Sequence, residues 1–348
     1  MQSSDRILVT GATGFLGARL VQELAGRGLR VRALSRQRSP APPPGFGWRE
    51  GEGPLYHPEV ERVQGDITDL DSLVRAASGC THVFHLAAYA KNWARDPATF
   101  FALNVQGMRN VFDAARRCGA QRVVWTSSVV TLGPTRPGEV GTEDMPRTTD
   151  RYFHEYEETK VIAEKEAIRA AEDGFPVVIA NPTRVYGPGH LSEGNSLSLL
   201  IEQYDQGKVW VLLNRGVNVG NYVLVDDVVR GLILAMEKGR VGQRYILGGE
   251  NATLKQFFRT IDEVTGKRHF QIPLLHITPL VFAYLQKKRA QWFGVYPTIT
   301  PGWVRSFCAD AAFSSAKAER ELGYQWTPLR EGVRLTYEWL LRVRQEQA

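Results

Sequence analysis

Residues 7–17 read ILVTGATGFLG, and this stretch joins two different hydrophobic periodicities. The apolar run Ile7–Thr10 predicts a short buried strand, and apolar residues then recur at helical spacing from Phe15 to Ala25. The glycines of the intervening turn are spaced three apart. Such glycines permit a tight turn, a close approach of the backbone to a pyrophosphate, and close packing of the helix on the sheet. The sequence therefore predicts a dinucleotide site formed by Gly11, Thr13, Gly14, Phe15, Leu16 and Gly17.

Short apolar runs and helical stretches alternate along the first half of the chain. The predicted strands are Ile7–Thr10, Val31–Leu34, His82–Leu86, Arg122–Ser127 and Val177–Asn181. The predicted helices between them are Phe15–Ala25, Asp69–Ala77, Pro97–Cys118 and Tyr152–Ala171. This alternation is typical of α/β proteins and predicts a doubly wound (Rossmann) parallel sheet.

The alternation loosens from Gly189 onward, where helical periodicity continues but strands become sparse. The helices predicted there are Ser196–Gln206, Val228–Lys238, Leu254–Thr265 and Leu329–Arg344. We therefore expect residues 1–188 to form the dinucleotide-binding domain, with sheet contributions from about 219–247. Residues 189–348 are expected to form mainly a smaller substrate-binding cap and the C-terminal helices.

The composition excludes several classes of protein. The 348 residues are 43% hydrophobic and 23% charged, which excludes disordered, collagen-like and coiled-coil chains. The net charge of +6 is scattered rather than clustered, so nucleic acid is not an expected partner. Three isolated cysteines and the lack of an HExxH pattern indicate no metal site and favour a cytoplasmic location. No apolar run reaches the ~20 residues of a transmembrane helix, which leaves open only peripheral membrane contact through Ile272–Trp292.

The end of the second predicted strand selects the nucleotide. An NAD-binding protein of this type carries an acidic residue about 20 positions after the glycine turn, where it holds the ribose 2′-hydroxyl. Residues 24–49 contain no Asp or Glu, and Ser35-Arg36-Gln37-Arg38 stands at the expected place. Arg36 can stack on adenine and pair with a 2′-phosphate, assisted by Arg38. We therefore expect NADP, and NAD bound without a carboxylate is the alternative.

Two further segments are expected to contact the cofactor. Asp66 and Ile67 follow a short predicted strand, and the Asp66 carboxylate is a candidate acceptor for the adenine amino group. Leu86, Ala87 and Ala88 end the next predicted strand. The small residues of that segment would let the chain run close beneath the cofactor.

The pattern Tyr156-x-x-x-Lys160 places a phenol and an ammonium on one face of a helix. An unperturbed tyrosine has a pKa of about 10, and a neighbouring ammonium is expected to lower it, which makes the phenol a usable acid or base. The same spacing recurs at Tyr284 and Lys288, but no hydroxyl-bearing strand precedes that pair. Tyr156, by contrast, follows the predicted strand that ends in residues 126–128, Thr-Ser-Ser. Tyr156 is therefore the predicted reacting group.

Motifs along the whole chain follow the order of a known family. They are TGATGFLG (10–17), NVQGMRNV (104–111), TSS (126–128), YEETK (156–160), NPTRVYGPG (181–189), VDDVVRG (225–231) and SSAKAERELGY (314–324). With these motifs the chain resembles an extended short-chain dehydrogenase/reductase of the NAD-dependent epimerase/dehydratase group. Within that group it is most similar to the dihydroflavonol-reductase-like and 3β-hydroxysteroid-dehydrogenase-like members.

The resemblance implies a role for each matched position. Ser128 matches the hydroxyl that polarises the substrate oxygen, and Tyr156 matches the proton donor or acceptor. Lys160 matches the residue that lowers the tyrosine pKa and holds the nicotinamide ribose, and Asn104 matches a helix residue that supports this lysine through water. Pro182 and Val185 match the segment that lines the nicotinamide. The resemblance also implies a homodimer formed through the helices 97–118 and 152–171.

The departures from the family pattern concern the substrate. Val129 and Val130 follow Ser128, so the acid of the sugar-nucleotide 4,6-dehydratases is missing. Gly220 stands where many sugar-nucleotide epimerases carry an arginine that grips a diphosphate, and Leu224 replaces the usual histidine. With the aromatic and apolar cap, these departures predict an NADP(H)-dependent oxidoreductase that interconverts a carbonyl and a secondary alcohol on an apolar small molecule. The alternatives are an NAD-dependent sugar-nucleotide epimerase and a non-catalytic redox-sensing binding protein.

Overall fold

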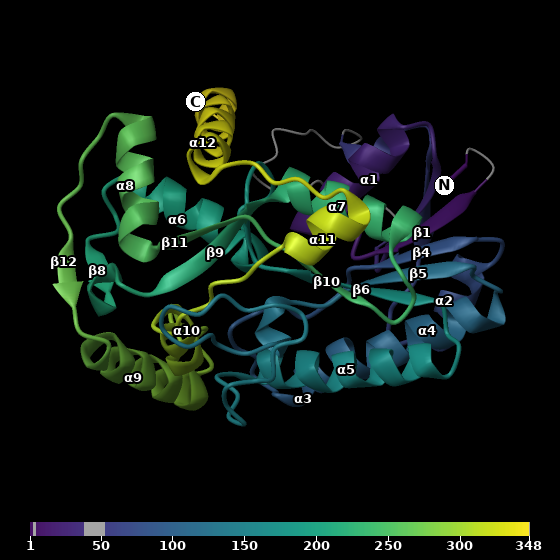
Figure 1. Ribbon diagram of the computed structural model, residues 1–348, viewed down its shortest axis with the longest axis horizontal. Coiled ribbons are helices and arrows are strands. Elements are labelled where there is room, and N and C mark those ends of the chain that lie inside the picture. Colours follow the sequence, from purple (N-terminus) through teal and green to yellow (C-terminus); the bar gives the residue numbers. More distant parts are fainter. Residues whose placement is uncertain (3–4, 38–52, 348) are drawn as a thin grey trace.

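A computed structural model describes residues 1–2, 5–37 and 53–347 of the chain (Figure 1). Its centre is a seven-stranded sheet in the order β10-β6-β5-β4-β1-β2-β3, in which every neighbouring pair is parallel. The chain therefore builds the sheet outward in both directions from β1, and the predicted doubly wound parallel sheet is confirmed. The strands are β1 (Arg6–Thr10), β2 (Arg30–Ser35), β3 (Val60–Gln64), β4 (His82–His85), β5 (Arg122–Thr126), β6 (Val177–Pro182) and β10 (Arg244–Leu247).

Helices cover both faces of this sheet because its strands carry apolar side chains on both faces. In β1, Ile7 and Val9 belong to the core shared with one layer of helices, whereas Leu8 belongs to the core shared with the other layer. The first layer comprises α1 (Phe15–Gly26), α7 (Val225–Lys238) and α11 (Ala316–Leu322). The second layer comprises α2 (Leu70–Ala77), α3 (Ala98–Phe101), α4 (Gly107–Arg117) and α5 (Glu155–Glu172).

One predicted helix is interrupted. Residues 97–118 form α3 and α4, joined by a π-helical turn over Ala102–Gln106. Such turns are frequent at functional sites, because the extra residue shifts the side chains that follow. Asn104 lies in the middle of this turn.

The C-terminal half contains more strands than its sequence predicts. It forms a three-stranded sheet in the order β11-β9-β7 and a two-stranded sheet of β8 and β12. These strands are β7 (Arg184–Tyr186), β8 (Val211–Leu213), β9 (Val219–Leu224), β11 (Glu250–Thr253) and β12 (Ile272–Leu274). Helical segments surround them: α6 (Ser196–Asp205), α8 (Leu254–Thr265), α9 (Ile277–Phe293), α10 (Pro301–Phe307) and α12 (Leu329–Gln347). Each of these strands has six residues or fewer, too few to show a clear period in the sequence.

Among the described residues, no helix has both the length and the apolar composition needed to cross a membrane. In Figure 1, α9 and β12 lie at one end of the molecule, and the seven-stranded sheet occupies the other. Helix α10 lies beside α9, between it and the second layer of helices.

Candidate active site

The glycine turn has the geometry that its sequence predicts. Gly11 has a φ of +73°, a conformation that residues with a Cβ rarely adopt, and a Cβ there would lie 2.7 Å from the backbone N of Ala87. A Cβ on Gly17 would lie 2.0 Å from the carbonyl oxygen of Gly11. The turn is therefore folded tightly against both the start of α1 and the segment after β4. This leaves a cradle of backbone at the N-terminus of α1, which fits a pyrophosphate.

A cavity of about 840 Å³ opens along the carboxyl ends of the central strands. It brings together most of the predicted site, although the residues come from many different segments. The lining includes Gly11, Gly14, Phe15, Leu16, Gly17, Arg36, Leu86, Ala88, Ser128, Tyr156, Lys160, Pro182 and Val185. Thr13, Asp66, Ile67, Ala87 and Asn104 do not line it. Arg38 lies outside the described residues.

The Asp66 carboxylate is engaged in its own loop. Its Oδ1 accepts hydrogen bonds from the backbone N and the hydroxyl of Thr68, each at 2.8 Å. The carbonyl oxygen of the next residue, Ile67, accepts a hydrogen bond of 2.8 Å from Asn110. Ala87 donates its backbone N–H to the Thr10 hydroxyl at 3.3 Å. In this structure these residues therefore order the loops beside the cavity, and their contact with a cofactor stays a prediction.

Arg36 follows β2 and is exposed at the edge of the cavity. Its backbone carbonyl accepts a hydrogen bond from Gln64 of β3 at 3.3 Å. Within the part of the chain that the structure describes, its guanidinium forms no ion pair with a carboxylate. The side chain is thus free to reach an anion in the cavity.

Ser128 and Tyr156 meet at the cavity wall. Ser128 follows β5 in extended conformation, Tyr156 lies in the first turn of α5, and both residues line the cavity. Burial raises the pKa of Tyr156 to about 12, and the influence of the neighbouring Ser128 hydroxyl, which lowers it, is smaller. The phenol is therefore protonated at neutral pH in this structure.

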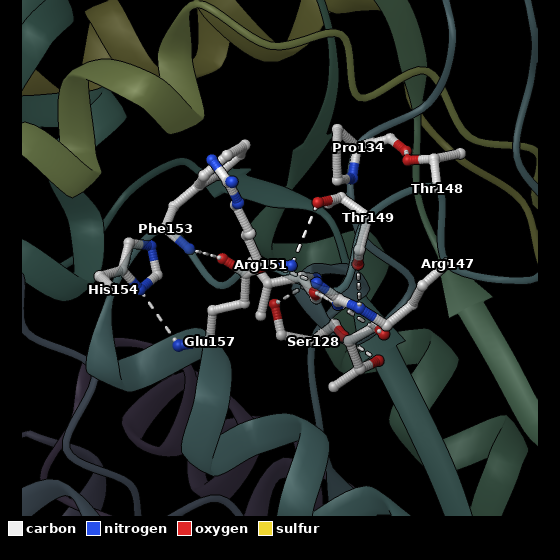
Figure 2. Close-up of polar contacts among 11 residues, drawn as sticks. Ser128, Pro134, Arg147, Thr148, Thr149, Arg151, Phe153, His154 and Glu157 are labelled. Atoms are coloured by element: carbon white, nitrogen blue, oxygen red, sulfur yellow. Dashed lines mark hydrogen bonds and ion pairs between the residues drawn. The ribbon is translucent and has the colours of Figure 1, made fainter.

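The start of α5 is tied to the turn that carries Ser128 (Figure 2). The Arg147 guanidinium donates to the Glu157 carboxylate at 2.8 Å and to the carbonyl oxygens of Val130 and Thr131 at 3.0 Å. The other carboxylate oxygen of Glu157 accepts the backbone N–H of Phe153 at 2.7 Å. This ion pair fixes the Ser128 and Tyr156 backbones relative to each other, and the sequence analysis did not identify it.

Lys160 is buried one turn after Tyr156. Its Nζ donates a hydrogen bond of 2.8 Å to the carbonyl oxygen of Thr126 and lies 6.0 Å from the centre of the Tyr156 ring. Burial lowers the pKa of Lys160 to about 8, and the charge of Glu164 raises it. The predicted lowering of the Tyr156 pKa by Lys160 is wrong for this arrangement, because the ammonium is held by the strand and burial dominates at the phenol.

Asn104 does not line the cavity beside Ser128, Tyr156 and Lys160. Its Oδ1 accepts the backbone N–H of Tyr89 at 2.7 Å, and its Nδ2 donates to the hydroxyl of Thr159 at 3.0 Å. Thr159 directly precedes Lys160 in α5. Asn104 therefore joins the segment after β4 to the helix that carries Lys160, and its role through water stays a prediction.

Glu164 is a buried carboxylate that the sequence analysis missed. Its Oε2 accepts hydrogen bonds from Ser127 at 2.6 Å, from Thr131 at 3.0 Å and from Asn181 at 2.6 Å. Its Oε1 lies 3.2 Å from Nη1 of Arg244. A signal was present, because Glu164 is four residues after Lys160, on the same buried helix face. The network ties α5 to β6, β10 and the segment that follows β5, one helical turn after Lys160.

The far wall of the cavity carries an arginine that the sequence analysis did not select. Arg184 of β7 donates a hydrogen bond of 3.1 Å to the carbonyl oxygen of Ser306, and its guanidinium lies 4.7 Å from the centre of the Phe307 ring. A Cβ on Gly220 would lie 2.3 Å from Nη1 of Arg184. The guanidinium thus fills the space in which a side chain at position 220 would begin.

The structure combines a glycine turn and a parallel sheet with a serine–tyrosine–lysine cluster at the carboxyl ends of the strands. This combination defines an α/β enzyme of the dinucleotide-binding class. The chain belongs to the NAD dependent epimerase/dehydratase family, whose model matches residues 7–248. It is accordingly an NAD(P)-dependent enzyme of the short-chain dehydrogenase/reductase type that acts on CH–OH groups.

Individual proteins are similar over nearly the whole chain. A provisionally named dihydroflavonol 4-reductase of Synechocystis sp. is 29% identical and covers 97% of this chain and 94% of its own length. The 3 beta-hydroxysteroid dehydrogenase/Delta 5→4-isomerase of Mycobacterium tuberculosis is 32% identical and covers 92% of this chain and 86% of its own length. The crystal structure of gox2253 matches with a TM-score of 0.80 and 32% identity, and 97% and 98% of the two chains are covered. The predicted resemblance is confirmed.

Proposed function

We propose that the protein is an NADP(H)-dependent oxidoreductase that interconverts a carbonyl and a secondary alcohol on an apolar small molecule. One observation carries the proposal: Ser128, Tyr156 and Lys160 line the same cavity as the glycine turn. A hydroxyl pair at this place can hold and protonate a substrate oxygen. Dehydrogenation of a steroid alcohol and reduction of a dihydroflavonol, for which the two relatives are named, are reactions of this kind.

The residues present fit a dinucleotide, since the glycine turn leaves the backbone cradle described above. The Gly11–Gly17 segment would hold the pyrophosphate, and Leu86, Ala88, Pro182 and Val185 would line the rest of the cofactor. When bound, the reduced cofactor supplies a hydride to the substrate carbon.

The chain itself handles the proton. In the reduction, Tyr156 donates its phenolic proton to the substrate oxygen, which becomes the hydroxyl of the product. Ser128 hydrogen-bonds that oxygen and so stabilises the negative charge that develops on it. Lys160 uses one of its three N–H groups on Thr126, which leaves two for the cofactor ribose or the phenol. A phenol with a pKa of about 12 is a proton donor at neutral pH, which agrees with the reducing direction.

NADP is the proposed cofactor because of the end of β2. Arg36 is exposed at the cavity edge, and no carboxylate occurs between residues 24 and 49 to bind a ribose 2′-hydroxyl. A guanidinium binds a 2′-phosphate through charge-assisted hydrogen bonds. Arg38 would assist it from the neighbouring segment.

The apolar substrate is proposed from the cap side of the cavity. Trp303 and Phe307 of α10 line it, with ring centres 4.3 Å apart, and Phe153 and Phe313 line it as well. Such a wall favours an apolar molecule that carries one polar group to be oriented. In this account residues 1–188 and β10 bind the cofactor, and residues 189–348 mainly bind the substrate.

Arg184 favours a second function, NAD-dependent epimerisation of a sugar nucleotide. The resemblance implies that many such epimerases grip the diphosphate with an arginine at the position of Gly220. Arg184 places a guanidinium in that space from a different strand. The cation whose absence argued against a nucleotide sugar is thus supplied by another residue.

The bound nucleotide separates the two functions. The purified protein is denatured, and the released nucleotide is identified and quantified by chromatography. Empty protein or substoichiometric NADP supports the reductase, and NADPH oxidation is then measured with a panel of apolar ketones and aldehydes. Near-stoichiometric NAD contradicts the proposed cofactor and supports the epimerase.

We also propose that the protein forms a homodimer and is located in the cytoplasm. Helices α4 and α5 lie side by side, and the Arg109–Glu166 ion pair joins them at 2.5 Å. Phe101 in α3 is an exposed aromatic side chain close to this pair. Light scattering of the purified protein tests the dimer, and a monomeric mass contradicts it.

A further inference from the structure

Helix α9 is held by a narrow strip of small residues. Its buried positions are Pro279, Ala283 and Ala290, and it packs mainly against α10. The large apolar side chains of α9 therefore face outward. Leu285 is 64% exposed, Trp292 is 75% exposed and Phe293 is 72% exposed.

Neighbouring segments extend this apolar surface. Phe270, Ile272 and Leu275 precede α9 and are exposed, and Val295 and Tyr296 follow it and are exposed. Together they form what we call the α9 surface: Phe270, Ile272, Leu275, Ile277, Val281, Phe282, Tyr284, Leu285, Trp292, Phe293, Val295 and Tyr296. A continuous stretch of exposed apolar side chains marks an interaction site rather than ordinary surface.

The charge of this surface has one sign. From Val264 to Ala309 the sequence contains no Asp or Glu, but six basic residues: Lys267, Arg268, Lys287, Lys288, Arg289 and Arg305. Lys267 is paired with Asp205 at 2.6 Å, and Arg305 binds the hydroxyl of Tyr284 at 2.6 Å. The basic residues of α9 itself form no ion pair within the described residues. Lys288 and Arg289 lie three and four residues after Leu285, so cations and apolar side chains share one helix face.

We propose that the α9 surface docks peripherally on an anionic phospholipid bilayer. Exposed Leu, Trp and Phe side chains would enter the region between headgroups and acyl chains, while the lysines and arginine meet the lipid phosphates. Tyr284, Trp292 and Tyr296 each have an apolar ring with one polar atom, which suits that interface.

A second copy of the chain is the less favourable occupant. A twofold contact places the same patch on both sides of the interface. It would bring Lys287, Lys288 and Arg289 of one copy against the cations of the other, with no carboxylate in residues 264–309 to neutralise them. An anionic bilayer presents the opposite charge.

Docking in this way would place the substrate cavity beside the lipid. Trp303, Ser306 and Phe307 of α10, on which α9 packs, line the cavity. Tyr296 of the α9 surface contacts Trp93, with ring centres 5.4 Å apart, directly after the cavity residues Lys91 and Asn92. An apolar substrate dissolved in the bilayer would then have a short path to the site. This last step rests on the proposed function, but the docking itself does not.

Vesicle co-sedimentation of the full chain tests the docking without any turnover. Phosphatidylcholine vesicles with and without phosphatidylserine are compared at low and high salt. We expect binding to the phosphatidylserine vesicles that weakens with salt, since exposed charges are screened. Wild-type protein that stays in the supernatant with both vesicles overturns the proposal.

Two sets of variants locate the surface. Leu285→Ser/Trp292→Ser/Phe293→Ser should lose more than ~10-fold in vesicle affinity, and Lys287→Gln/Lys288→Gln/Arg289→Gln should lose roughly 100-fold, at about fivefold per charge. Val241→Ser/Leu341→Ser, which removes exposed apolar side chains elsewhere, should bind as wild type does.

The controls keep the result interpretable. Circular dichroism and NADPH binding check that each variant folds, because none of the substituted residues lines the cavity. Variants that fold but bind vesicles like the wild type contradict the proposal. A wild-type dimer that the apolar variant converts to a monomer, with no vesicle binding by either, would show that a second copy covers the surface and would also contradict it.

Discussion

The Nζ atom of Lys160 lies 2.8 Å from the carbonyl oxygen of Thr126, two residues before Ser128. This hydrogen bond joins the helix that carries Tyr156 to the strand that leads to Ser128. It also explains why the ammonium has little effect on the phenol, from whose ring centre it lies 6.0 Å. Lys160 therefore joins the two hydroxyl-bearing segments, and in the proposed function its remaining N–H groups bind the cofactor.

The buried ammonium predicts an alkaline limit on activity. Burial lowers the pKa of Lys160 to about 8, so Lys160 loses its proton as the pH rises through that value, while Tyr156 stays protonated. We expect kcat/KM for reduction to fall above about pH 8. In Lys160→Arg the charge persists throughout this range, so the remaining activity should show no fall near pH 8. A fall at the same pH in both proteins would assign the titration to another group.

The same pKa predicts how stability changes with pH. Because the folded pKa of Lys160 lies below the ordinary lysine value of 10.5, the unfolded chain binds more protons between about pH 8 and 10.5. The contribution of this group to the free energy of unfolding should therefore rise with pH in that window. Urea unfolding of the wild type and of Lys160→Met measures it, and an identical slope for both proteins would contradict the predicted burial.

Arg36 should discriminate between the two nicotinamide cofactors. Arg36→Gln removes the cation at the end of β2, and we expect kcat/KM for NADPH to fall by ~10–100-fold while that for NADH changes little. Arg30→Gln, at the exposed start of the same strand, is the matched control and should leave both values unchanged. Equal losses for NADPH and NADH in Arg36→Gln would show that Arg36 does not read the 2′-phosphate.

Glu164 should matter for stability far more than Glu166 on the same helix. Glu164→Gln weakens buried hydrogen bonds to three side chains and leaves Arg244 without its carboxylate, at a cost of ~2–4 kcal/mol in free energy of unfolding. Glu166→Gln breaks a pair in which both side chains are partly exposed, at a cost below ~1 kcal/mol. Chemical denaturation of the two variants is the measurement. Equal losses would mean that the Glu164 network contributes no more than a surface pair.

Arg184 tests the choice between the two substrate classes. Met at this position keeps a long unbranched side chain but removes the guanidinium that lies over the Phe307 ring. If the substrate is neutral and apolar, Arg184→Met should change kcat/KM for ketones by less than ~3-fold. A large rise in KM for a UDP-sugar, with turnover at saturation preserved, would instead favour the sugar-nucleotide epimerase.

The sequence allowed a prediction wherever a position accepts only one residue type for a clear physical reason. The glycine turn could be predicted because Gly11 and Gly17 leave no room for a Cβ. The shared position of Tyr156 and Lys160 in the cavity lining could be predicted because they are a helical turn apart and follow a strand that ends in serines. In both cases the spacing within one segment contains most of the geometry.

Contacts between segments that are far apart in the sequence could not be predicted from residue spacing. Arg184 fills the space above Gly220, which lies on another strand and 36 positions away in the sequence numbering (220 − 184). The pKa of Tyr156 depends on how deeply the phenol is buried and on the direction of the Lys160 side chain, neither of which the spacing reveals. Helix α9 was not predicted, because its own apolar residues lie on nearly all of its sides and so show no helical period in the sequence.

The most direct test of the central claim is NADPH oxidation by Tyr156→Phe with the best apolar ketone of the panel, together with a fluorescence titration of NADPH binding. Removal of the phenolic hydroxyl should lower turnover by at least ~100-fold, because no other proton donor reaches the substrate oxygen in this account. NADPH affinity should stay within ~3-fold of the wild-type value, which separates loss of proton transfer from loss of the fold. A Tyr156→Phe protein that turns over at near wild-type rates would contradict the assignment of Tyr156 as the proton donor.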